Sequence, residues 1–200
     1  MPLQQGALEA IMSEVTINTR NIYNGRLLKL RVETVRLPDG RETTKEIVEH
    51  PGAVAIIPIL NNGKLLFVKQ YRTAARTHMV EIPAGTLEAD EMPLACAKRE
   101  LIEETGYAAQ HLTKLFSCYL APGYSSEKIH FFLARQLVRT KMRPAEDEFI
   151  TVQAMELDAA LKAIERGKIQ DAKTISSLYY LAMHRTKRLP GKSRRRRSIE

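Results

Sequence analysis

The sequence predicts an α/β protein: a layered α/β/α sandwich with a mixed sheet and an N-terminal antiparallel meander of strands. Two observations lead to this prediction. Strand-like runs recur between residues 15 and 157, and helical patterns are interposed among the later ones and close the chain. In addition, 44% of the 200 residues are hydrophobic, which is enough to bury one sizeable core.

The first strands are short and bounded by turn residues. Three runs within residues 15–49, VTINTR, LLKLRVETVRL and TTKEIVEH, have alternating apolar residues. An Asn-Gly pair at 24–25 and Pro-Asp-Gly at 38–40 separate these runs with turn chemistry. We therefore expect a three-stranded meander over 15–49, preceded by an N-terminal extension over 1–14.

The main domain is predicted over residues 50–187. AVAIIPIL and KLLFVKQY, joined by Asn-Asn-Gly at 61–63, indicate a hairpin of two apolar strands. Further strand-like runs are LTKLFSCYL (112–120), KIHFFLARQL (128–137) and FITVQAMEL (149–157). Helical periodicity covers residues 92–105, 158–166 and 171–187, and Asp158 and Asp171 are candidate N-caps of the last two helices.

The formal net charge of +8 is concentrated at the C-terminal end of the chain. RTKRLPGKSRRRRSIE supplies the excess of basic residues, and the remainder is nearly neutral. We interpret residues 188–200 as a basic, disordered and solvated tail, with nucleic-acid contact as the less favoured alternative. No apolar run is long enough for a membrane span and the first residues lack the order of a signal peptide, so we expect a cytoplasmic protein without a membrane partner.

One predicted helix carries negative charge where it destabilises a helix. Pro93 suits the first turn and Gly106 suits the position after the last turn. The face expected to pack on the sheet contains Leu94, Ala97, Leu101 and Thr105, and the opposite side carries Arg99, Glu100, Glu103 and Glu104. Like charges four residues apart, near the negative end of the helix dipole, cost a few tenths of a kcal/mol each.

Two interpretations fit these charges. One is a solvated face on which Arg99 pairs with Glu103. The other is a site for a hard cation, formed by the carboxylates and by backbone near Gly85, where a residue without Cβ allows close approach. A bound cation would offset the repulsion, so the pattern favours the metal site.

The spacing of these residues resembles a known motif. Gly85, five residues, Glu91, seven residues and then RELIEETGY from Arg99 to Tyr107 look like the complete Nudix box of hydrolases that cleave nucleoside diphosphates linked to another group. The resemblance implies the Nudix-type α/β/α fold and hydrolysis of a diphosphate, with Mg²⁺, or alternatively Mn²⁺, as cofactor.

The resemblance also implies roles, position by position. The metal ligands would be two principal carboxylates, a supporting carboxylate and a backbone carbonyl, namely Glu100 and Glu104, Glu103, and Ala84. Arg99 would orient the acidic cluster through ion pairs, and Glu91 would lie outside the direct ligands.

Three segments resemble the ADP-ribose pyrophosphatase subfamily: VKQYR at 68–72, VEIPAG at 80–85, and Pro122, fifteen residues after Tyr107. By that likeness, substrate would be bound by Arg72 at a phosphate, by Glu81 on the ribose or adenine side, by Tyr71 at the adenine ring, and near Pro122. The alternatives are that Pro122 marks an ordinary turn and that Arg72 is a surface cation paired with Glu81.

An acidic loop, PAEDEF at 144–149, matches a loop of the same subfamily. The likeness implies that Glu146 is the general base and that Glu148 is a further metal-associated carboxylate, with the two roles interchangeable. A water molecule deprotonated by one of them would attack phosphorus, and ADP-ribose would give AMP and ribose 5-phosphate.

Two other functions stay open at this point. The box fixes the bond that is cleaved and not the sugar, so GDP-mannose or another nucleoside diphosphate sugar is an alternative substrate. A Nudix-fold ligand sensor or RNA-binding regulator is the alternative from another class, encouraged only by the arginines at 194–197. The resemblance further implies a homodimer in which residues 15–49 contribute to the partner's adenine pocket.

Overall fold

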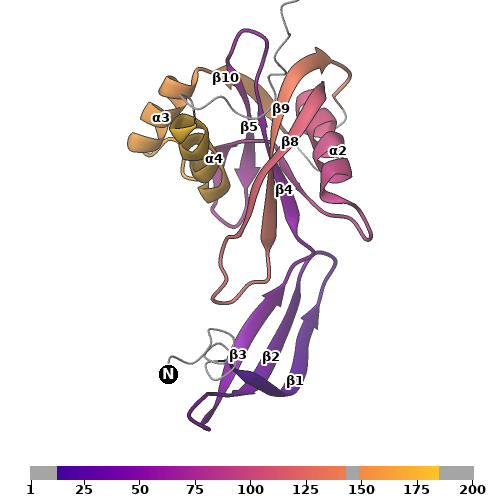
Figure 1. The fold of residues 1–200 in the computed structure, drawn as a ribbon, viewed down its shortest axis with the longest axis vertical. Helices are drawn as coiled ribbons and strands as arrows, with labels where there is room; N and C mark the ends of the chain where they lie inside the picture. Colours follow the sequence, from indigo (N-terminus) through magenta and orange to yellow (C-terminus); the bar gives the residue numbers. More distant parts are fainter. Residues whose placement is uncertain (1–12, 143–148, 185–200) are drawn as a thin grey trace, which may run out of the picture. The chain divides into compact units, whose positions relative to one another are not determined.

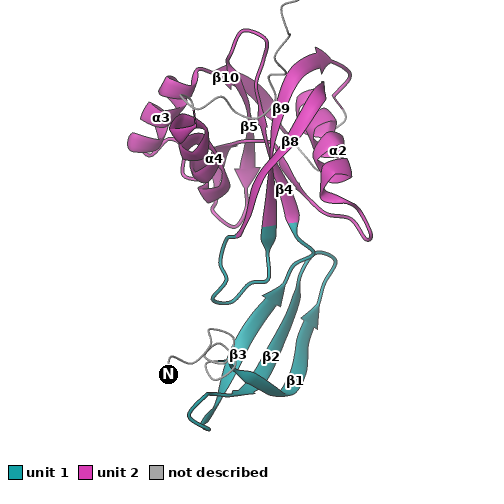
Figure 2. Cartoon of the chain, viewed as in Figure 1, with its two compact units in different colours: residues 1–52, 119–128 teal, residues 53–118, 129–200 magenta. Residues whose placement is uncertain are grey.

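The computed structural model describes residues 13–142 and 149–184. The chain forms two compact units (Figure 2): the first contains the residues up to Gly52 together with Tyr119–Lys128, and the second contains Ala53–Cys118 and the residues from Ile129 on. The predicted boundary after residue 49 lies close to this division. The predicted tail at 188–200 lies outside the described residues.

The first unit is built on an antiparallel sheet of three strands, as predicted. Its strands are β1 (Val15–Asn24), β2 (Lys29–Arg36) and β3 (Glu42–Glu49), in the order β1-β2-β3. Side chains along the whole of β1 are exposed, and Val35 is the one buried hydrophobic residue among those described in this unit. The sheet therefore has almost no core of its own within one chain.

A loop distant in sequence is joined to this sheet by backbone hydrogen bonds. The Val48 amide donates to the Tyr124 carbonyl at 2.7 Å, and the Ser126 amide donates to the Val48 carbonyl at 3.0 Å. The His50 amide donates to Ser126 Oγ at 3.0 Å. These bonds make the Tyr119–Lys128 segment part of the first unit.

The second unit contains two sheets and three helices. One sheet has the order β7 (Ala84–Thr86), β4 (Ala53–Pro58), β9 (Lys128–Arg139), β8 (Tyr107–Tyr119), and the other has the order β10 (Thr151–Met155), β5 (Leu65–Arg72), β6 (Thr77–Glu81). The helices are α2 (Pro93–Thr105), α3 (Leu157–Glu165) and α4 (Ala172–Met183). Strand β4 runs parallel to β9 and antiparallel to β7, so its sheet is mixed, as predicted.

The core has two layers because successive side chains of a strand point to opposite faces. Ala55 and Ile57 of β4 pack in a cluster with residues of α3 and α4. Val54 and Ile56 of the same strand pack in a second cluster with residues of α2. The helices lie on both sides of the sheets (Figure 1), and the predicted α/β/α sandwich is confirmed. No helix in the described part of the chain is long and apolar enough to cross a membrane.

Two local predictions need correction. The turn at Asn61–Gly63 forms, with the Leu60 amide donating to the Lys64 carbonyl at 2.9 Å, and Ile59 pairs antiparallel with Leu65 beside it, but beyond this bridge β4 and β5 belong to different sheets. The fully buried β4 instead pairs with β7 and β9. Asp158 lies inside the first turn of α3, whose N-cap is Glu156, whereas Asp171 caps α4 as predicted.

Candidate active site

Helix α2 presents the acidic cluster and is bounded as its sequence predicts. Pro93 stands in its first turn, and the left-handed Gly106, with φ 70°, ends it and donates to the Ile102 carbonyl at 2.9 Å. Its buried hydrophobic residues are Cys96, Ala97 and Leu101. Leu94, predicted to face the sheet, is 44% exposed, because the buried stripe begins with Cys96 and Leu94 lies on the outer side of the first turn.

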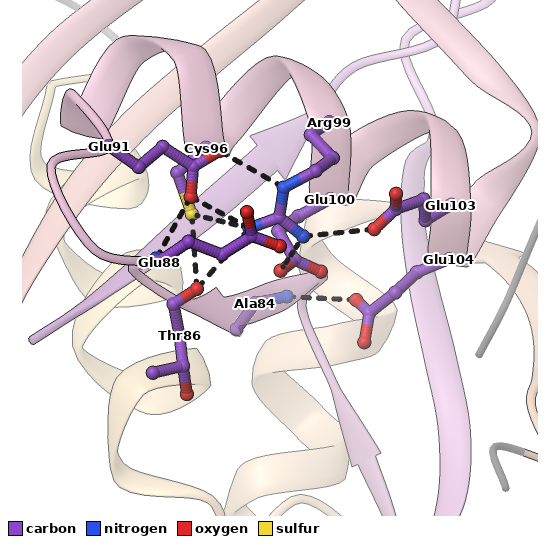
Figure 3. A network of polar contacts seen from close by, with 9 residues as sticks. All are labelled: Ala84, Thr86, Glu88, Glu91, Cys96, Arg99, Glu100, Glu103 and Glu104. Carbon is purple, nitrogen blue, oxygen red and sulfur yellow. Dashed lines mark hydrogen bonds and ion pairs between the residues drawn. The ribbon is translucent and has the colours of Figure 1, made fainter. Parts of the chain in front are cut away.

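Arg99 lies at the centre of the cluster (Figure 3) and binds three carboxylates. Its Nε and Nη2 donate to the two oxygens of Glu91 at 3.0 and 2.9 Å. Its Nη1 donates to Glu100 Oε1 at 2.6 Å and to Glu103 Oε2 at 3.0 Å. The predicted Arg99–Glu103 pair therefore exists, but as one part of a larger network.

The network shifts the acidity of its members. The hydrogen bonds from Arg99 outweigh partial burial and lower the pKa of Glu91 to about 2. The same contact with Glu91 is the largest cause that raises the pKa of Arg99. Burial, reinforced by the negative charges of Glu91 and Glu100, raises the pKa of the Cys96 thiol to about 12. Cys96 is therefore an uncharged packing residue at neutral pH and not a nucleophile.

Gly85 is required by the position of Glu100. A Cβ atom built on residue 85 would overlap the carboxylate of Glu100, so only glycine lets that carboxylate rest against the backbone of β7. This refines the predicted reason for the glycine, since the group that approaches it in the structure is a side chain of α2.

Glu104 is 2% exposed, which was not expected for a residue on the polar side of the helix. Its Oε2 accepts a hydrogen bond of 2.9 Å from the Ala84 amide. The preceding carbonyl, of Pro83, accepts a bond of 2.8 Å from the Ile56 amide. The backbone at 83–84 is thus held from both sides, by β4 and by α2.

The oxygen atoms of this cluster are suitable ligands for a hard divalent cation. Glu100 and Glu104 place carboxylates against the backbone at 84–85, and carboxylate and carbonyl oxygens are the ligands that Mg²⁺ prefers. Within the described residues no three acidic, histidine or cysteine side chains are grouped closely enough to hold a metal by themselves. A complete site would need the Ala84 carbonyl, water, substrate or the predicted acidic loop, whose Glu146 and Glu148 lie outside the described residues.

A second polar cluster is formed by Arg72 and Glu81. Arg72 Nε and Nη2 donate to the two carboxylate oxygens of Glu81, each at 2.7 Å. The Glu81 residue is 1% exposed. Burial tends to raise its pKa, but Arg72 and Lys173 outweigh burial and the pKa is lowered. Hydrogen bonding to Glu81, with smaller effects from Glu104 and Asp171, raises the pKa of Arg72.

Lys173 completes this cluster, and its role was not predicted from the sequence. Its Nζ donates to Glu81 Oε2 and, at 2.9 Å, to Asp171 Oδ1. A signal was present: Lys173, Ser177 and Leu181 follow one another at four-residue intervals along the buried stripe of α4. A lysine on such a stripe requires a buried partner.

Tyr71 and Pro122 are the two other predicted substrate residues. Tyr71 is 53% exposed and its ring makes an edge contact with His78, the ring centroids being 5.3 Å apart. Because it neighbours Arg72 in β5, its side chain points to the opposite face of the strand. Pro122 is exposed and lies in a turn of the first unit, where the Ala121 carbonyl accepts from the Tyr124 amide at 3.1 Å.

The α/β/α sandwich and the acidic end of α2 define a protein of the Nudix class. The NUDIX domain family model matches residues 49–178, and the model for the nucleoside diphosphate sugar hydrolase N-terminal domain matches residues 14–44. The first match covers more than half of the chain. The chain therefore belongs to the Nudix family of hydrolases, and the predicted family is confirmed. Such hydrolases generally need a divalent metal ion.

Individual proteins and one solved structure are also similar to this chain over most of its length. The chain is 44% identical to an ADP-ribose pyrophosphatase of Bacillus subtilis, over 86% of this chain and 94% of the relative. It is 42% identical to a methanol dehydrogenase activator of Bacillus methanolicus, over 86% and 95%. A GDP-mannose pyrophosphatase of Citrobacter koseri is 37% identical, over 68% and 77%. The crystal structure of an ADP compounds hydrolase, 23% identical, matches the fold with a TM-score of 0.76 over 85% of this chain and 92% of that one.

Proposed function

We propose that the chain hydrolyses the diphosphate of ADP-ribose to AMP and ribose 5-phosphate, with Mg²⁺ as its cofactor. The observation that carries the proposal is the acidic cluster of α2, in which Glu100 rests against Gly85 and Glu104 binds the Ala84 amide. The ADP-ribose pyrophosphatase of B. subtilis, at 44% identity, supports the choice of substrate.

In this proposal Glu100 and Glu104, with the Ala84 carbonyl and support from Glu103, hold the metal. The metal would neutralise charge on the diphosphate and make water more acidic. Arg99 keeps three carboxylates in place while leaving the cluster strongly negative.

Other side chains bind the substrate and deprotonate the attacking water. Arg72 binds a phosphate of the substrate, held in place by Glu81. Glu146 or Glu148 removes a proton from the water that attacks phosphorus, so that the bond between phosphorus and the bridging oxygen breaks. Tyr71 and the turn at Pro122 are assigned to the substrate by family resemblance alone.

GDP-mannose is the second candidate substrate, because the relative from C. koseri acts on it and is 37% identical. The acidic cluster serves either substrate equally, since it acts on the diphosphate. Selectivity must then come from residues that contact the base or the sugar.

We also propose that the protein is a homodimer and that the meander contributes to the partner's adenine pocket. The exposed hydrophobic side chains of β1, among them Val15, Ile17 and Ile22, support this proposal, because a sheet with so little core needs a cover.

The test is a substrate panel with Mg²⁺: ADP-ribose, ADP-glucose, GDP-mannose, NADH and a dinucleoside polyphosphate. We expect the highest kcat/KM for ADP-ribose, with AMP and ribose 5-phosphate as products by mass spectrometry. A kcat/KM for GDP-mannose or NADH about tenfold above that for ADP-ribose would overturn the substrate and leave the reaction class standing. Absence of hydrolysis with every substrate and metal would overturn the enzyme itself.

The variant Glu104→Gln tests the proposed metal site. It keeps the shape and an acceptor for the Ala84 amide but removes a charge, so turnover should fall by about 100-fold or more. Metal-free stability in urea should change by less than about 1 kcal/mol, because the charge that is removed is repelled by Glu100 and attracted by Arg72, and these two effects oppose each other. Glu165→Gln, at the exposed end of α3, is the matched control and should keep full activity. A larger loss of stability in Glu104→Gln would make that carboxylate a structural partner instead.

A further inference from the structure

Arg72 uses only one edge of its guanidinium for Glu81. Nε and Nη2 both donate to that carboxylate, and among the described residues Nη1 has no hydrogen-bond partner. The Arg72 side chain is 41% exposed, whereas that of Glu81 is 1% exposed. The pair therefore combines a buried carboxylate with a cation whose side chain is partly accessible to solvent.

Lys173 lies on the buried side of the same carboxylate. Its ammonium group contacts Glu81 Oε2, the oxygen that also accepts from Arg72 Nη2, and it donates to Asp171 Oδ1 at 2.9 Å. The two cations thus hold one carboxylate between them, and only Arg72 is accessible to a ligand in solvent.

The position of Lys173 is itself fixed by the start of α4. Asp171 caps the helix by accepting from the Thr174 amide at 2.9 Å. Thr174 Oγ1 accepts from the Ile82 amide at 2.9 Å, and Ile82 is the residue next to Glu81. The first turn of α4 and the end of β6 are therefore joined both by the Thr174 hydroxyl and by Lys173.

A carboxylate bound by Arg72 alone would follow the motion of an exposed side chain, and it would lose part of its pairing whenever Arg72 turned to another anion. Lys173 removes this dependence because it pairs with Glu81 from inside the protein. A fixed carboxylate in turn restricts Arg72 to one orientation, which lowers the entropy cost of binding an anion with the free edge.

We propose that Lys173 is a positioning residue for the diphosphate: it fixes Glu81, and Glu81 fixes Arg72 so that the free edge of the guanidinium binds a phosphate of the substrate. This inference rests on the proposed role of Arg72 in substrate binding. Lys173 itself does not touch the substrate.

The first experiment needs no substrate. The Arg72 Nε–H signal, assigned by its loss in Arg72→Lys, is followed by ¹⁵N NMR in the full chain. Exchange of this hydrogen with water should be slow in the wild type and about tenfold faster in Lys173→Met, because its carboxylate acceptor is released. Lys168→Met, at an exposed position before α4, is the matched control and should leave exchange unchanged. Lys173→Gln replaces Lys173→Met if the latter does not fold by circular dichroism.

The second experiment is a double-mutant cycle on ADP-ribose hydrolysis. Lys173→Met should raise KM by about tenfold with a smaller change in kcat, and it should add less than about twofold to the KM of Arg72→Ala. Independent effects that multiply in the double mutant would overturn the inference, because Lys173 would then not act through Arg72.

The two experiments separate this inference from the proposed function. If the wild type does not hydrolyse ADP-ribose but Lys173→Met still releases the Arg72 Nε–H, the proposed substrate is wrong and the positioning role stands. If ADP-ribose is hydrolysed but exchange at Arg72 is the same in Lys173→Met as in the wild type, the positioning role is wrong and the proposed function stands.

Discussion

Arg99 reduces the electrostatic repulsion between the carboxylates of the acidic cluster. Glu91, Glu100 and Glu103 each pair with it, and Glu104 adds a fourth carboxylate nearby on the same helix. A single guanidinium cannot neutralise four carboxylates, so a metal ion would supply charge that the side chains of the cluster lack. The repulsion inferred from sequence is therefore reduced, but not removed, by Arg99.

Glu91 gives this network a dependence on pH. Arg99 holds its pKa at about 2 in the folded protein, against an ordinary value of 4.5, so the unfolded chain binds the proton more tightly. The stabilisation from Glu91 is present above pH 4.5 and is lost as the pH falls towards 2. At pH 7, Glu91→Gln should be less stable than the wild type by about 1 kcal/mol, a modest value because the pair is partly exposed.

The measurement is urea unfolding of both proteins between pH 7 and about pH 3.5. The difference in the free energy of unfolding should shrink as the pH falls below 4.5, since Glu91 takes up a proton in the unfolded wild type while it is still ionised in the folded protein. A difference that is constant with pH would show that the ion pair with Arg99 does not carry the effect.

Gly85→Ala tests the contact between Glu100 and β7. The backbone of Gly85 does not need a positive φ, so alanine is tolerated by the main chain, but its Cβ displaces the Glu100 carboxylate. We expect kcat to fall by about 100-fold while the thermal midpoint changes by less than about 5 °C, because a side chain can rotate away. Isothermal titration should show weaker Mg²⁺ binding, and unchanged binding and turnover would contradict the contact.

At the scale of elements, α4 combines two kinds of buried polar group. The Lys173 ammonium group and the Thr174 hydroxyl have hydrogen-bond partners, whereas Ser177 Oγ is buried and has none among the described residues. An unsatisfied buried hydroxyl costs about 1–3 kcal/mol. The Ser177 hydroxyl is therefore expected to lower the stability of the folded protein.

Ser177→Ala should raise the free energy of unfolding by about 1 kcal/mol, because it removes that cost and favours the helix. Ser176→Ala is a matched control, since Ser176 Oγ is exposed and already donates to the Ala172 carbonyl at 2.8 Å. Both variants are compared with the wild type by urea unfolding. A loss of stability in Ser177→Ala would mean that the hydroxyl has a partner in solution.

The elements predicted well are those whose limits are encoded locally. Pro93 and Gly106 bound α2, and Asp171 caps α4, because each acts on its own backbone neighbourhood. Strands β6 and β7 were not among the predicted strands, since both are very short and their partners lie elsewhere in the chain. The two-sheet arrangement around β4 depends on parallel pairing with the distant β9, which no short pattern encodes.

In the candidate site, too, the residues that were predicted are those whose positions are encoded locally in the sequence. Arg99, Glu100, Glu103 and Glu104 were predictable because the motif holds them at fixed spacing along one helix. Lys173 was not, since it meets Glu81, 92 positions away in the sequence, only once the chain between them is folded. Glu146 and Glu148 lie outside the described residues, and their roles stay predictions.

At the scale of the whole molecule, the exposed meander supports the proposed dimer. Sedimentation at micromolar concentration should give twice the mass of one chain. Tyr23→Glu combined with Ile17→Glu places charge on β1, where both side chains are exposed, and should shift the protein to monomers with reduced affinity for ADP-ribose. A wild-type monomer with full activity would contradict the dimer and its shared pocket.

The hydrogen bonds between Val48 and the loop at 119–128 have a consequence for protein engineering and for evolution. The first unit is discontinuous in sequence, because it combines the residues up to Gly52 with the distant Tyr119–Lys128 segment. A chain truncated after Gly52 would leave the backbone groups of Val48 without their partners at Tyr124 and Ser126. Grafting this unit between homologues therefore requires two coordinated exchanges, and a recombination event with a single crossover would yield a mismatched chimera.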